Sequence, residues 1–186
     1  AFDVSKNVLS IGGSNLHPDG YHPSDAFGGV AGTYFPGEVI FSDNGYAGQK
    51  DFLTVSSVLP VSIVGIRLLT YDDSYNPGSF NRGLSQFKMF AGKNPEALVE
   101  VFSTSLSGNF KQSYGSAGIE LVASFDEVVA NFFRFEFSRV NSTGPRIVEI
   151  DAISAVPEPS ALSTFCVGVG VVCLILYRRR RGLMSV

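Results

Sequence analysis

A strict two-residue alternation in the stretch FFRFEFS, residues 132–138, constrains the fold of this chain more than any other feature. From residue 133 onward, phenylalanine occupies every second position, and the positions between hold charged or hydroxyl side chains. Successive side chains of a β-strand point to opposite faces of a sheet, so the pattern predicts a strand with one buried and one solvated face. The predicted inward residues are Phe133, Phe135 and Phe137, and the predicted outward residues are Arg134, Glu136 and Ser138.

Eight further apolar or alternating runs predict additional strands. They cover residues 8–11, 37–41, 52–58, 62–70, 85–91, 98–103, 119–125 and 146–154. Segments rich in Gly, Asn, Ser, Asp and Pro separate them, and only residues 125–131 look like a helical turn. Many short strands with frequent turns predict an all-β fold, an antiparallel β-sandwich formed as one domain by residues 1–155.

The end of the chain has a different character. Residues 160–177 carry no charge, and a helix of that length rises about 27 Å, close to the thickness of the hydrocarbon core of a bilayer. The basic cluster that follows is Arg178, Arg179, Arg180 and Arg181. This order predicts a single transmembrane helix with its C-terminus in the cytoplasm, which leaves the predicted sandwich outside. A buried helix of a soluble domain is the alternative interpretation.

The residues before the apolar run are Val156-Pro-Glu-Pro-Ser160. With the helix and the arginine cluster, they resemble the PEP-CTERM sorting tail of Gram-negative bacteria, here residues 156–186. The resemblance implies anchoring in the inner membrane, recognition of Pro157, Glu158 and Pro159 by the membrane-embedded transpeptidase exosortase, and removal of the tail. It also implies a final place at the cell surface or outside the cell, with biofilm and extracellular polysaccharide. A plain C-terminal anchor with a proline-punctuated linker is the alternative.

Charge and cysteine content limit the function classes. Four of the fourteen Lys and Arg residues lie in the tail and no acid follows Glu158, so the residues before the apolar run hold ten basic against seventeen acidic side chains, a net charge of −7. An acidic domain lacks the basic surface that nucleic-acid phosphates require, so we expect no nucleic-acid partner. Cys166 and Cys173 both fall in the apolar run, so the predicted sandwich must fold without disulfides.

Three parts of the predicted sandwich resemble discoidin-like domains, also called F5/8 type C or galactose-binding-like jelly rolls. They are VSIVGIRLL at residues 61–69, NRGLSQFKMFAGKN at 81–94, and FFRFEF at 132–137 with GPRIVEID at 144–151. The resemblance implies a jelly roll that binds a ligand through loops at one end and does not catalyse. The chain departs from many carbohydrate-binding relatives because it contains no tryptophan.

The loop TYDDSYNPGSFNR, residues 70–82, offers the side chains best suited to a saccharide, and an extracellular glycan is the expected partner. Tyr71 and Tyr75 provide rings that stack on a sugar face. The side chains suited to bind sugar hydroxyls are Asp72, Asp73, Asn76, Asn81 and Arg82. The same residue types also build ordinary long turns, which is the alternative interpretation.

The discoidin resemblance also implies a structural calcium ion, held by an N-terminal loop and an acid near the last strand. Glu149 occupies the second position. The loop is SDAFGG at residues 24–29, where Gly28-Gly29 replaces the usual Asp-Gly and Asp25 lies near enough to substitute. Calcium accepts six to eight oxygens in irregular geometry, so such a substitution is chemically acceptable. A solvated loop and an exposed carboxylate are the alternative.

No catalytic motif is present in the sequence. There is no Gly-x-Ser-x-Gly elbow, no cysteine outside the apolar run, and the spacing of His17 and His22 matches no established zinc pattern. We therefore expect a binding protein and not an enzyme. The alternatives are a small glycan-active hydrolase that uses loop carboxylates, and a purely structural matrix protein without a ligand.

Overall fold

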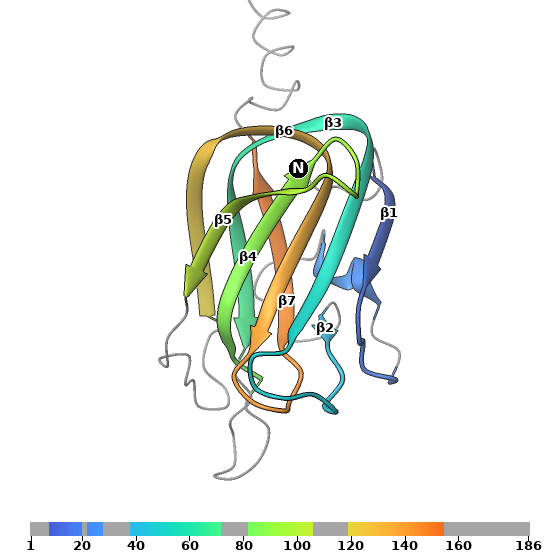
Figure 1. Cartoon of the computed structure of the whole chain (residues 1–186), viewed down its shortest axis with the longest axis vertical. Helices are drawn as coiled ribbons and strands as arrows, with labels where there is room; N and C mark the ends of the chain where they lie inside the picture. Colours follow the sequence, from blue (N-terminus) through green and yellow to red (C-terminus); the bar gives the residue numbers. More distant parts are fainter. Residues whose placement is uncertain (1–7, 20–21, 28–37, 72–81, 106–118, 155–186) are drawn as a thin grey trace, which may run out of the picture. The chain divides into compact units, whose positions relative to one another are not determined.

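The computed structural model describes residues 8–19, 22–27, 38–71, 82–105 and 119–154, which belong to one compact unit (Figure 1). Seven strands and one short 3-10 helix account for most of these residues. In chain order they are β1 (Val8–Gly13), η1 (Pro23–Ala26), β2 (Val39–Ile40), β3 (Lys50–Tyr71), β4 (Leu84–Gly92), β5 (Val99–Ser105), β6 (Ile119–Arg139) and β7 (Arg146–Ile153).

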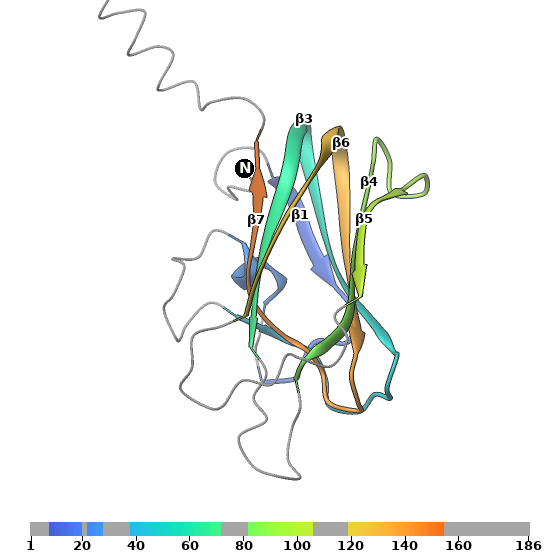
Figure 2. The same ribbon diagram turned by 90° about the vertical axis from the view of Figure 1, so that its left-hand side faces the viewer.

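All strand pairs are antiparallel, in the order β2-β7-β3-β6-β4-β5, with β1 paired to β3. β3 and β6 are 22 and 21 residues long, and each contributes to both layers. The front sheet consists of β1, residues 50–57 of β3, residues 132–139 of β6, β4 and β5. The back sheet consists of β2, β7, residues 61–71 of β3 and residues 119–130 of β6. Figure 2 shows β7 on one side of the fold and β4 with β5 on the other.

The two long strands pass from one sheet to the other at a bend. Their pairing register breaks between Ser56 and Val61, and the bend holds Val58 and Leu59, which are 60% and 66% exposed, and Pro60. Proline has no N–H to donate to a ladder, so it is accommodated where the regular pairing is interrupted. The bend lies at the end of the sandwich opposite to the loops that join β2 to β3 and β6 to β7 (Figure 1).

The predicted antiparallel β-sandwich is confirmed, but the helical turn predicted for residues 125–131 is wrong. This segment is part of β6, and residues 128–130 pair with residues 61–63 of β3. Its apolar residues occur at a spacing that fits a helix, but pairing with a long neighbouring strand overrides that local preference. The two runs predicted as separate strands at 52–58 and 62–70 are likewise one continuous strand.

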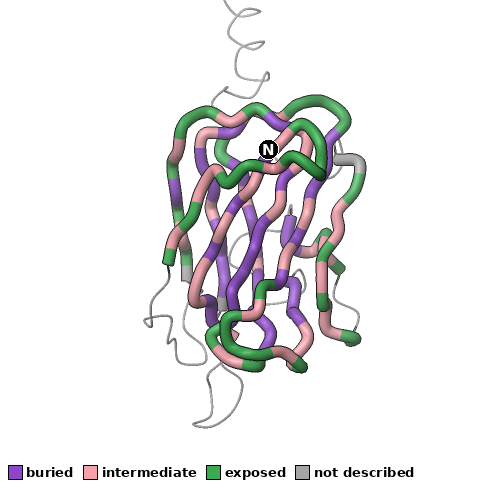
Figure 3. Tube along the Cα trace, viewed as in Figure 1, coloured by how far each residue is buried: buried purple, intermediate pink, exposed green. Residues whose placement is uncertain are grey.

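Phenylalanine rings from the front sheet occupy the centre of the core. Phe133, Phe135 and Phe137 are 1%, 0% and 0% exposed, which confirms their predicted inward orientation. The ring of Phe87 on β4 lies 5.6 Å from that of Phe137 and 6.5 Å from that of Phe135. Figure 3 shows buried residues along the strands and exposed residues at the turns.

Within the described residues, no helix is long and apolar enough to span a bilayer. The predicted transmembrane run, residues 160–177, lies outside the described residues, as do Pro157, Glu158, Pro159 and the four arginines. The predictions of sorting and membrane topology therefore stay predictions.

Candidate functional site

Three described segments meet at one end of the sandwich, which we call the loop end: residues 42–49, 82–83 and 140–145 (Figure 1). The first joins β2 to β3, the second leads into β4, and the third joins β6 to β7. Backbone hydrogen bonds link the first and third segments, because Gly45 N–H donates to Ser142 O at 3.1 Å and Phe41 N–H, directly before the first segment, donates to Pro145 O at 3.1 Å. The loop end is thus a connected platform.

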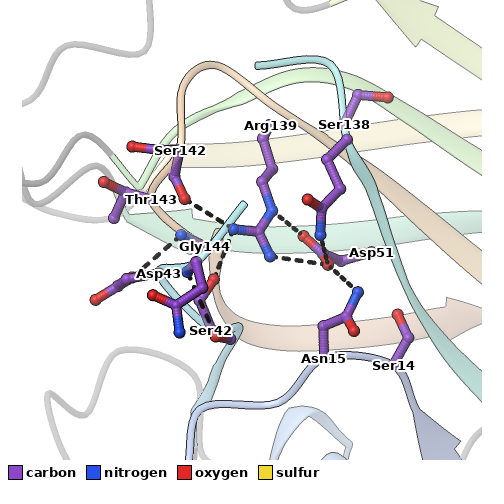
Figure 4. A network of polar contacts seen from close by, with 12 residues as sticks. Ser14, Asn15, Ser42, Asp43, Asp51, Ser138, Arg139, Ser142, Thr143 and Gly144 are labelled. Atoms are coloured by element: carbon purple, nitrogen blue, oxygen red, sulfur yellow. Dashed lines mark hydrogen bonds and ion pairs between the residues drawn. The ribbon is translucent and has the colours of Figure 1, made fainter. Parts of the chain in front are cut away.

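A buried ion pair forms the centre of this platform (Figure 4). Arg139, the last residue of β6, donates from Nε to Oδ2 of Asp51 at 2.6 Å and from Nη2 to Oδ1 at 3.0 Å. Both side chains are 0% exposed. The amides of Asn15 and Gln49 add longer bonds to Asp51 Oδ1, at 3.2 and 3.4 Å. Such bidentate pairing fixes the orientation of the guanidinium as well as its position.

The remaining nitrogen of Arg139 holds the two loops together. Nη1 donates to the carbonyl oxygen of Ser42 at 2.6 Å and to that of Ser142 at 2.9 Å. Gly45 leaves the space that this guanidinium occupies, because a Cβ at that position would lie 2.3 Å from Nη1. The sequence places glycine where the backbone must approach a buried cation.

A second arginine makes a similar connection nearer the surface. Arg82 donates from Nη1 and Nη2 to the two oxygens of Asp43, at 2.8 and 3.0 Å, and from Nη1 to Gly144 O at 3.0 Å. Gly144 N–H in turn donates to Asp43 Oδ1 at 3.2 Å. Arg82 therefore has a structural role and is only 11% exposed, and its predicted binding of sugar hydroxyls stays a prediction.

The predicted saccharide loop starts and ends on this platform. Tyr71 pairs with Arg146 in the β3–β7 ladder, and Arg146 N–H donates to Arg82 O at 3.4 Å, so both ends of the loop meet at one residue of β7. Arg146 is itself held by Glu38 through a buried bond of 2.6 Å from Nε. The predicted ligand residues Asp72, Asp73, Tyr75, Asn76 and Asn81 lie outside the described residues, so their role stays a prediction.

Tyr46 is a candidate binding residue that was not predicted from the sequence. It lies in the turn DNGYAG, residues 43–48, and is 69% exposed, the most exposed large side chain among the described apolar residues. The turn is held rigidly, since Gly48 has φ of +82° and donates its N–H to Arg139 O at 2.9 Å. A lone aromatic residue between two glycines of a polar turn is the sequence signal that would have found it.

His17 lies beside the same platform. Its Nε2 is 3.9 Å from Asp43 Oδ2 and its Nδ1 is 3.3 Å from Asp19 Oδ2. Across the described segments, no group of three or more His, Cys, Asp or Glu side chains is arranged to hold a metal ion. His17 therefore belongs to the polar rim of the loop end, where it faces carboxylates.

The predicted calcium residues occupy other elements. Asp25 lies in η1, where its Oδ2 accepts the N–H of His22 at 3.1 Å. Glu149 lies on β7, and η1 contacts β7. The Glu149 side chain is 6% exposed, and its Oε2 lies 3.5 Å from Nη1 of Arg67 but accepts no hydrogen bond among the described residues. Burial raises the pKa of the Glu149 carboxyl, the charge of Asp151 raises it further, and Arg67 opposes both.

No protein-family model and no curated protein sequence matches the chain. Solved structures do match. A family 32 carbohydrate-binding module of AlyQ, in complex with 4,5-unsaturated mannuronic acid, shares 19% identity at a TM-score of 0.54, covering 80% of this chain and 96% of that one. A chitosan-binding module of a chitosanase/glucanase from Paenibacillus sp. IK-5 shares 13% identity at 0.57, covering 78% and 94%. A family 32 module from Clostridium perfringens, in complex with GalNAc-β-1,3-galactose, shares 10% identity at 0.57, also covering 78% and 94%.

These similarities identify the fold as the antiparallel β-sandwich that these solved structures share. Matching structures also include a fucosidase from Ruminococcus gnavus, of which this chain covers 25%. The match to that enzyme is therefore confined to one part of it.

Proposed function

We propose that the chain is a carbohydrate-binding module that recognises an extracellular glycan through its loop end. The observation that carries this proposal is a rigid polar platform that presents an exposed ring, Tyr46, and that holds both ends of the predicted saccharide loop, Tyr71 and Arg82. Aromatic rings stack on the C–H faces of sugars, and the surrounding amides and carboxylates suit sugar hydroxyls. The proteins with the same fold named above, which include a chitosan-binding module and complexes with saccharides, support the same ligand class.

A glycan-array screen of the full chain, kept in a non-glycosidic detergent because of its apolar C-terminal run, tests this proposal. We expect saturable binding to at least one glycan, weakened about tenfold or more by Tyr46→Ala because an exposed aromatic anchor is lost. Tyr71→Ala and Tyr75→Ala test the predicted loop in the same way. Tyr46→Phe should retain binding, and Leu59→Ala, a similarly exposed side chain at the opposite end, is the matched control. A folded chain that binds no glycan would support a purely structural role.

We further propose that the module is exported, anchored in the inner membrane and then processed through its PEP-CTERM-like tail to the cell surface. The support is the order of Pro157-Glu158-Pro159, an uncharged run of eighteen residues and four arginines. In cells that contain an exosortase, Glu158→Ala should leave an uncleaved precursor in the membrane fraction. A mature form of normal size and amount would contradict the sorting proposal without affecting the glycan proposal.

Calcium is the third part of the proposal, with Glu149 and the loop that contains Asp25 as its ligands. The support is a buried carboxylate oxygen that accepts no hydrogen bond among the described residues, which a cation would satisfy. Repeating the array with calcium and with a chelator shows whether the ion contributes to binding. Measuring the melting temperature under both conditions shows whether it contributes to stability.

A further inference from the structure

A pocket of about 200 Å³ lies on the outer face of the front sheet, away from the loop end. The residues that line it include Ser10, Thr54, Ser56, Phe132, Pro95 and Leu98. The alternation of the strands explains the orientation: Val55 and Phe133 are each 1% exposed and face the core, so their neighbours in sequence face outward. β4 extends from the loop end to this pocket, a distance of about 26 Å at the usual rise of a strand.

The turn between β4 and β5 forms one wall of the pocket. Gly92 pairs with Phe132, and a Cβ at Gly92 would lie 2.6 Å from Ala97 O and 3.1 Å from Leu98 Cδ2. The turn therefore folds directly over the sheet, which requires glycine at this position. Asn94 fixes the turn, because its Oδ1 accepts the N–H of Glu96 at 3.2 Å.

The pocket combines hydroxyl groups with an aromatic ring. Ser10 Oγ and Ser56 Oγ form a hydrogen bond of 2.9 Å, and Thr54 adds a third hydroxyl. A hydroxyl group donates one hydrogen bond and accepts two, so a pair that shares one bond still has capacity for a ligand. Phe132 lies outside the hydrophobic core cluster, and its ring supplies an apolar surface beside these hydroxyls.

Among the described residues, no charged side chain lines the pocket. Arg134, the next outward residue of β6, is directed elsewhere, because its Cζ lies 4.2 Å from the ring centre of Phe52 and its Nη2 lies 2.9 Å from Oε1 of Glu136. A lining that combines hydroxyls with the outward-facing ring of Phe132 and aliphatic groups matches a neutral ligand with one apolar and one hydroxylated side.

We propose that this pocket is a second saccharide site, which holds a single neutral sugar ring with its C–H face against Phe132 and its hydroxyls toward Ser10, Thr54 and Ser56. Its volume is below the range of drug-sized ligand pockets, so it suits one ring and not a longer chain segment. The site is separate from the loop end, and its occupation does not depend on binding there. A module with two such sites would bind two glycan ends and crosslink them.

The absence of tryptophan from the chain provides a specific test. Phe132→Trp places a single fluorescent indole at the floor of the pocket and keeps an aromatic surface there. Phe90→Trp is the matched control, since Phe90 faces outward on the adjacent strand and does not line the pocket. Each full-length variant is titrated in a non-glycosidic detergent with galactose, N-acetylgalactosamine, glucose and mannose, and with glucosamine and galacturonate as charged comparisons.

We expect at least one neutral sugar to change the emission of the Phe132→Trp variant saturably, while the charged sugars and the Phe90→Trp variant give no change. Adding Leu98→Ala should weaken the apparent affinity about tenfold, because part of the apolar wall is lost. The larger indole could itself block the pocket, so the NMR amide shifts of Thr54 and Leu98 are also recorded in the unsubstituted chain with the same sugars. No emission change together with no shift at these amides would overturn the proposal.

The glycan array on the unsubstituted chain separates the two sites. If Tyr46→Ala abolishes binding on the array, and no sugar changes the emission or the amide shifts at the pocket, the second site is refuted and the proposed function stands. If a sugar changes the signals at the pocket, and the loop-end variants leave binding on the array unchanged, the second site is supported and the loop-end proposal is refuted. No glycan binding on the array together with no signal change at the pocket refutes both the loop-end proposal and the second site.

Discussion

Removal of the Arg139 guanidinium tests how the loop end is held together. In Arg139→Met, the carboxylate of Asp51 stays buried at 0% exposure and keeps, from the described residues, only the bonds of 3.2 and 3.4 Å from Asn15 and Gln49. An uncompensated buried charge typically destabilises a protein by about 3–5 kcal/mol. The carbonyl groups of Ser42 and Ser142 also lose their shared donor, but both lie in loops that water reaches, so they add little.

Urea unfolding followed by circular dichroism measures this effect. With a urea m-value of about 2 kcal/mol/M, a loss of about 4 kcal/mol lowers the unfolding midpoint by about 2 M. Lys88→Met is the control, because Lys88 pairs with a partly exposed Glu100 on the outer face of the front sheet, and such pairs contribute about 0–1 kcal/mol. A midpoint change for Arg139→Met no larger than that of the control would refute the assignment.

The double variant Arg139→Met with Asp51→Leu separates the buried charge from the packing. Because both charges are removed, its destabilisation should be well below the sum of the two single variants. Additive effects would show that the pair is not coupled and that the loops are held by other contacts. Glycan affinity measured on the same variants would then show whether the platform matters for binding.

Three other predictions address the core, a loop glycine and a buried acid. Phe135→Ala should destabilise the protein by about 3–5 kcal/mol, since the ring is 0% exposed; a change below about 1 kcal/mol in urea unfolding would contradict its place in the core. Gly144→Ala should lower the melting temperature, because its Cβ would lie 2.0 Å from Phe41 O; an unchanged melting temperature would show that the loop shifts freely. Because the pKa of Glu149 is raised, the folded protein binds the carboxyl proton of Glu149 more tightly than the unfolded chain does. The stability that this proton contributes is fully present below the pKa of a glutamate in the unfolded chain, about 4.3. It is lost as the pH rises through the pKa of Glu149 in the folded protein. In the presence of a chelator, Glu149→Gln should therefore be more stable than the unsubstituted chain at neutral pH, and this difference should shrink toward acid pH. Added calcium should stabilise the unsubstituted chain alone. If Glu149→Gln is less stable than the unsubstituted chain at neutral pH in chelator, this reasoning is contradicted.

The strands of the core could be predicted because alternation is a local signal. Phe133, Phe135 and Phe137 alternate with polar residues, and such a pattern can bury one face only in a sheet. The segment 125–131 could not be predicted correctly, because its conformation depends on residues 61–63, more than sixty positions away. Local spacing carries no information about that partner.

The connections of the loop end were equally hidden. Arg139 and Asp51 are 88 positions apart, and each alone looks like an ordinary solvated charge at the end of a strand. Gly45 and Gly144 look like turn residues, although the structure shows that close contacts exclude a Cβ at both. Tyr46 does not stand out in the sequence, because the longer loop at 70–82 offers more aromatic and polar groups. Sequence therefore predicts where the loops lie but not which side chains support them.

The two long strands also determine the order in which this protein can fold. Every layer of the sandwich contains part of β3 and part of β6, and their paired residues are separated by about 50 to 90 positions along the chain. The front sheet cannot be completed until residue 139 has left the ribosome, and the back sheet also needs β7, which ends at Ile153. Contacts of such long range make folding slow. Until then, β1 is the only partner of β3 among the described segments that precede it, and the other edge of β3 is open to other chains. We expect this protein to depend, during synthesis, on factors that shield an unpaired strand of 22 residues.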